Sequence, residues 1–81
     1  MLTENIHSWE QPVQVELNGT THDVLTPAQA RNILLIEWPG EHTGLHKAAS
    51  QACLAAMEGA DPQTAWSAFV EAAAEAGILV G

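Results

Sequence analysis

Basic residues are almost missing from this sequence. Arg31 and Lys47 stand against ten aspartates and glutamates, which gives a formal net charge of −8. Nucleic-acid-binding surfaces neutralise phosphates with lysine and arginine, and an acidic surface is repelled by anionic lipid headgroups. The composition therefore argues against direct binding of nucleic acid or membranes. It suits solubility, or a basic protein as partner.

Cysteine is equally scarce. Cys53 is the single cysteine, so it cannot form a disulfide within the chain. Residues 1–8 lack the charged segment and apolar run of a secretory signal, and no apolar stretch approaches the roughly 18 residues of a membrane span. These absences predict a reduced, cytoplasmic protein.

Aromatic residues are few, since tyrosine is absent and only three tryptophans and one phenylalanine occur among the 81 residues. With 47% hydrophobic residues, the core must be built mainly from aliphatic side chains and alanine. The length allows one domain. We expect a flexible tail over residues 1–8 and a single α+β domain over residues 9–81.

A β-hairpin is predicted near the beginning of the domain. Residues 12–17 alternate between apolar and polar side chains, Asn18-Gly19 is a strong two-residue turn signal, and residues 20–25 return as a second strand. A two-residue turn pairs Val15 with His22 and places both on the face that covers the core. His22 is therefore expected at the core or its edge.

Three helices are predicted after the hairpin. Capping residues and prolines delimit them at about 27–38, 43–58 and 62–76. The short apolar run 78–80 is expected to add a third strand. The predicted fold is thus α+β in the order β-β-α-α-α-β, with a three-stranded antiparallel sheet covered on one face by the three helices. Which hairpin edge receives the third strand stays open.

The first predicted helix is apolar on nearly all sides. Leu35 and Ile36 lie off its main apolar stripe, and such a helix is either enclosed by its own domain or offers a second apolar face to a partner. An 81-residue domain has little material to enclose it. We therefore interpret Leu35 and Ile36 as interface candidates. Trp66, at the margin of the third helix, is a third candidate because aromatic side chains often anchor protein interfaces.

One edge of the central helix carries the residues best suited to chemistry. His42 and His46 have the i,i+4 spacing of two helical metal ligands, and Cys53 follows on nearly the same edge. However, His46 and Cys53 are two turns apart, roughly 10 Å along the axis, which is too far for one ion to bridge easily. We expect no metal and no cofactor here, and we treat His42, His46 and Cys53 as weak candidates. A nucleophilic Cys53 is the corresponding enzymatic hypothesis, but a cysteine on an alanine-rich face more often packs as a small apolar residue.

A set of ordered motifs runs through nearly the whole chain. They are Trp9-x-x-Pro12-Val13-x-Val15, Ala30 leading into Trp38-Pro39, Gly44 and His46 ahead of Cys53, Gly59 and Pro62, and finally Ala65, Phe69, Ala72-Ala73 and Glu75-Ala76-Gly77-Ile78-x-Val80. In their order and spacing the chain resembles the small bacterial domain-of-unknown-function family 982. The resemblance implies a compact stand-alone domain without an established activity. Trp66 departs from the family pattern, in which an arginine is expected after the alanine of the third helix.

Two classes of function remain for this small acidic domain. The first is a protein–protein interaction or regulatory module that docks on a partner or on a second copy through Leu35, Ile36 and Trp66. The alternative is a small-ligand or metal-binding protein that uses the His42, His46 and Cys53 edge. An enzyme is not expected, because the sequence offers no set of acid, base and nucleophile.

Overall fold

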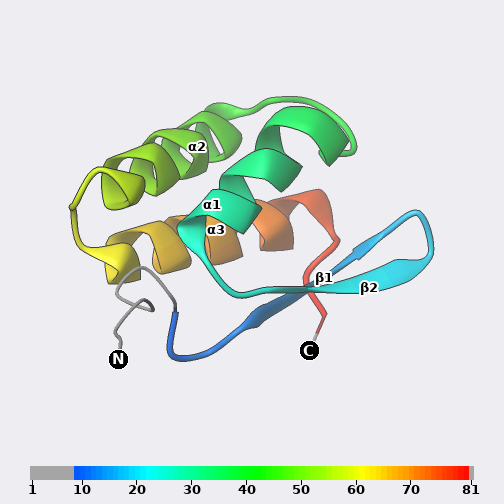
Figure 1. Cartoon of the computed structure of the whole chain (residues 1–81). Helices are drawn as coiled ribbons and strands as arrows, with labels where there is room; N and C mark the ends of the chain where they lie inside the picture. Colours follow the sequence, from blue (N-terminus) through cyan, green and yellow to red (C-terminus); the bar gives the residue numbers. More distant parts are fainter. Residues whose placement is uncertain (1–8, 81) are drawn as a thin grey trace.

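The computed structural model describes residues 9–80, so the tail predicted for residues 1–8 lies outside the described residues. Figure 1 shows a β-hairpin on one side of a layer of helices. The elements follow one another as β1 (Val13–Leu17), β2 (Thr20–Val24), α1 (Pro27–Asn32), the π-helical segment η1 (Ile33–Glu37), α2 (Gly44–Met57) and α3 (Pro62–Ala76). An α+β fold with an antiparallel hairpin and three helical regions is thereby confirmed.

The hairpin has the predicted register. Val15 lies opposite His22, and the turn at Asn18 and Gly19 has positive φ at both residues, as a two-residue hairpin turn requires. The side chains of β1 alternate between buried and exposed along the whole strand. In β2 only Val24 is buried; His22 is half-buried, and the other three residues are exposed.

The prediction of a third strand over residues 78–80 is wrong. The sheet has two strands, and the C-terminal segment adds one antiparallel bridge between Val15 and Leu79. This bridge rests on two backbone hydrogen bonds, Glu16 N–H to the Ile78 carbonyl at 2.8 Å and Val80 N–H to the Gln14 carbonyl at 2.9 Å.

The first helix also differs from its prediction. It divides at Ile33 into α1 and η1 and ends at Glu37 rather than at Trp38. Trp38 has an extended backbone (φ −69°, ψ 124°), as expected for a residue that precedes a proline. At the other end, Thr26 caps α1 as predicted, since its hydroxyl accepts a hydrogen bond from Gln29 N–H at 3.1 Å.

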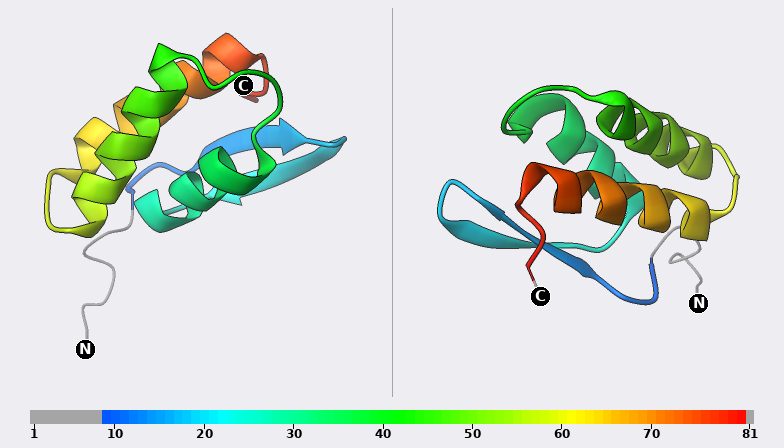
Figure 2. Two further views of the ribbon diagram at one scale, coloured as in Figure 1. Left: turned by 90° about the horizontal axis from the view of Figure 1, so that it is seen from above. Right: turned by 180° about the vertical axis from the view of Figure 1, so that it is seen from behind.

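One core joins the hairpin to the helices. Its fully buried members include Val15, Leu34, Cys53 and Phe69, and alanines of α2 and α3 fill the space between these two helices, which make the most extensive contact in the molecule. The helices lie together on one face of the hairpin (Figure 2), and the buried side chains of β1 alternate with exposed ones. Within residues 9–80, none of the helices has the length and apolarity needed to cross a membrane.

Candidate functional site

His46 is the buried polar residue around which the start of α2 is arranged. It is 3% exposed, and its Nε2 lies 2.7 Å from the carbonyl oxygen of Leu34. A carbonyl only accepts, so Nε2 carries the hydrogen and donates it. The reason lies in the preceding turn: a π-helix pairs each carbonyl with the N–H five residues on, and for Leu34 that residue is Pro39, which has no N–H. The imidazole therefore supplies the donor that the backbone lacks.

Two aromatic contacts hold the His46 ring. Trp38 meets it edge-on, with ring centroids 5.4 Å apart and planes at 62°, and the exposed His42 stacks on it at 4.0 Å with planes at 10°. The second ring nitrogen, Nδ1, is buried without a hydrogen-bond partner in the described part of the chain. His46 thus has one engaged nitrogen and one enclosed nitrogen.

This geometry does not suit a shared metal ion. A metal bound by two imidazoles must lie in the plane of both rings, and the nearly parallel planes of His42 and His46 do not meet at a short distance. His46 Nε2 is already occupied by Leu34. No group of three or more potential ligands for a metal occurs among residues 9–80. The structure brings the two histidines together, but it does not join them with Cys53 into a ligand set.

Cys53 lies in the interior of the core between the helices. It is fully buried, and burial raises the pKa of its thiol to about 11, an effect that the charge of Arg31 partly opposes. At neutral pH only about one thiol in ten thousand would then be ionised, and the thiolate is the reactive form. These properties are those of a packing residue rather than an accessible nucleophile.

Thr43 and Glu75 hold the start of α2 beside His46. Thr43 caps α2, because its hydroxyl oxygen accepts a hydrogen bond from His46 N–H at 3.3 Å, and the same hydroxyl donates to Glu75 near the end of α3. A threonine three residues before His46 is a recognisable capping signal. The partnership with Glu75 joins positions 32 residues apart and has no local signal in the sequence.

Leu35 and Ile36 project from η1 into solvent. Their exposed fractions are 51% and 72%, whereas Ile33 and Leu34 in the same segment are 8% and 0% exposed. The buried pair anchors the segment in the core and the exposed pair lies on its outer side. The structure therefore places both interface candidates together, adjacent in sequence and on one short helical turn.

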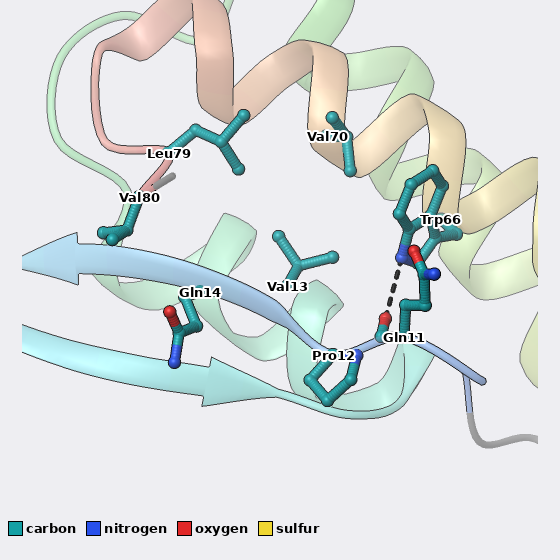
Figure 3. Close-up of a pocket in the computed structure, with 8 residues that line it drawn as sticks. All are labelled: Gln11, Pro12, Val13, Gln14, Trp66, Val70, Leu79 and Val80. Atoms are coloured by element: carbon teal, nitrogen blue, oxygen red, sulfur yellow. Dashed lines mark hydrogen bonds between the residues drawn. The ribbon is translucent and has the colours of Figure 1, made fainter.

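Trp66 lies in a different place from these two residues. Its ring is half-buried, and its indole Nε1 donates a hydrogen bond to the carbonyl of Gln11 at 2.9 Å (Figure 3). Figures 1 and 2 show η1 and the first turns of α3 far apart in every view. The three interface candidates thus belong to two separate surfaces.

Comparison with known proteins gives one match. Residues 11–80 match the family described as protein of unknown function (DUF982). The chain belongs to this family. The family match covers both the His46 site and the two exposed surfaces, but its description assigns no activity to any of them. No curated protein and no solved structure matches the chain.

Proposed function

We propose that this DUF982 domain is a protein–protein interaction module that docks through Leu35 and Ile36. The observation that carries the proposal is the exposure of these two adjacent aliphatic side chains, 51% and 72%, beside the buried Ile33 and Leu34 of the same segment. Isolated exposed apolar residues are ordinary on protein surfaces. Two neighbours on one anchored segment form a more specific feature, because together they offer a continuous apolar contact.

The anchoring of η1 supports the proposal. Its inner side is fixed by the buried Ile33 and Leu34, and the carbonyl of Leu34 accepts the hydrogen bond from His46. A binding surface on a fixed segment loses little conformational freedom when a partner docks, so more of the contact energy appears as affinity. In this interpretation His46 is a positioning residue for the docking segment, and the histidine edge serves the interaction rather than chemistry.

The charge of the domain favours a different protein over a second copy. Two domains of net charge −8 repel each other, whereas a neutral or basic partner would be attracted. Glu37 and Glu41 are both exposed close to the apolar pair in sequence and add to the local negative charge. We therefore expect a partner with an apolar contact surface bordered by basic residues.

Site-specific photocrosslinking tests the proposal. A photoreactive amino acid is placed at Ile36 and, as a control, at Gln51, an exposed position on α2, and the protein is irradiated in cells of its natural host. We expect one discrete heterologous adduct from position 36 and none from position 51. An adduct between two copies of the domain would show that the partner is a second copy and not a different protein. The same adducts from both positions, or none from either, would contradict docking at η1.

A further inference from the structure

A second surface, separate from η1, carries a row of neighbouring hollows, of which the one lined by Gln14 and Asp23 lies on the outer face of the hairpin. Four hollows of about 250 to 350 Å³ lie side by side along residues 9–14, and neighbouring hollows share lining residues. Gln11 and Trp66 line both of the first two, while Pro12, Gln14 and Val80 line both the second and the third. We call this surface the Trp66 groove; it extends from the start of α3 to the C-terminal segment.

Most of the residues that line the middle of the groove are apolar, and Gln11 and Gln14 line it beside them. Figure 3 shows Trp66 and Val70 of α3 and Leu79 of the C-terminal segment facing Pro12 and Val13 across a hollow of about 280 Å³. Leu79 and Val80 are 36% and 37% exposed, so the apolar side chains at this end are only partly covered by the chain itself. The hollow can accept an aliphatic side chain.

The walls of the groove are fixed by hydrogen bonds between distant parts of the chain. Trp66 Nε1 donates to the Gln11 carbonyl at 2.9 Å, and Trp9 Nε1 donates to the Pro62 carbonyl at 3.0 Å. The Gln11 carbonyl is therefore already used, and Pro12 has no N–H to offer. An added β-strand would find few backbone partners here. The exposed side-chain amides of Gln11 and Gln63 instead provide donors and acceptors suited to an extended peptide backbone.

The charge along the groove has one sign. Glu10, Asp61 and Asp23 line its hollows, and neither Arg31 nor Lys47 does. An acidic, rigid groove with an apolar centre complements a basic segment that carries an apolar residue. We infer that the Trp66 groove binds an extended, lysine- or arginine-containing segment of another protein, with one apolar side chain seated between Trp66, Val70 and Leu79. This binding mode is additional to docking at η1.

NMR titration with synthetic peptides tests the inference. The probe is an acetylated and amidated heptapeptide of lysine and glutamine around a central leucine; one counterpart has glutamate in place of lysine, and another has serine in place of leucine. With the ¹⁵N-labelled domain, the lysine–leucine peptide should shift the Trp66 indole signal and the Gln11 and Gln63 amides. Either counterpart should bind at least about tenfold more weakly, because it loses the charge complementarity or the buried side chain.

Matched charge reversals locate the binding. Glu10→Lys reverses a charge in the groove, and Glu41→Lys makes the same change at an exposed position that does not line it. The first should weaken binding several-fold and the second should leave it nearly unchanged. Equal losses in both variants, equal binding of the glutamate peptide, or shifts confined to other surfaces would overturn the inference. Ile36→Ser separates the two proposals, because it should abolish docking at η1 and leave peptide binding intact.

Discussion

Replacement of His46 by phenylalanine probes the hydrogen bond that holds η1. The variant His46→Phe keeps a buried aromatic ring beside Trp38 and His42 but removes the donor to the Leu34 carbonyl. A buried acceptor deprived of its partner costs about 1–3 kcal/mol. For a domain of 81 residues, whose free energy of unfolding is about 4–12 kcal/mol, this is a substantial fraction. The expected fall in Tm is about 4–8 °C for each kcal/mol lost.

Urea unfolding followed by circular dichroism measures this change, and His42→Phe is the matched control. His42 is exposed and stacks on the same ring, so its replacement should change the free energy of unfolding by less than about 0.5 kcal/mol. Amide hydrogen exchange should also become faster within Ile33–Glu37 in His46→Phe. A stability equal to that of the control, with unchanged exchange in η1, would refute the role given to His46.

Three further predictions concern the core, the turns and metal binding. Burial raises the pKa of Cys53 from 9.0 to about 11, so the protonated thiol stabilises the folded state below pH 9. This contribution, up to about 2–3 kcal/mol, is lost as the pH rises from 9 to 11. In urea unfolding, the stability advantage of wild type over Cys53→Ala should therefore shrink between pH 9 and 11. Gly77 and Gly44 both have open space for a Cβ, but of the two only Gly77 has a positive φ (75°). Gly77→Ala should therefore lower the free energy of unfolding by about 1–2 kcal/mol, and Gly44→Ala should not, as thermal melts would show. Because the His42 and His46 rings are nearly parallel, excess zinc or chelator should leave Tm unchanged, and a zinc-dependent rise would restore the metal hypothesis.

Local signals explain why the hairpin and the start of the first helix were predictable. Asn18-Gly19 fixes the turn and therefore the register that pairs Val15 with His22, and Thr26 caps α1 where the sequence placed a helix start. These features depend on neighbours within a few residues. The alternation of apolar and polar side chains then determines which strand face meets the helices.

The errors arose where a distant contact decides the structure. The segment after Gly77 has the composition of a strand, but it meets β1 at one bridge only. The first helix divides at Ile33, next to the Leu34 carbonyl that accepts a hydrogen bond from His46. His46 lies twelve residues after Leu34, so the helix propensities of neighbouring residues cannot predict this contact. The separation of Trp66 from Leu35 and Ile36 likewise depends on the three-dimensional arrangement and has no local signal in the sequence.

The proposal that η1 is a docking surface is tested most directly by NMR of the ¹⁵N-labelled domain in concentrated lysate of its host. Docking predicts that amide signals of Ile33–Glu37 broaden selectively, and that Ile36→Ser, which removes the most exposed of the large apolar side chains in the described chain, restores them. Signals that remain sharp in the wild-type domain, or that broaden equally in Ile36→Ser, would contradict docking at Leu35 and Ile36.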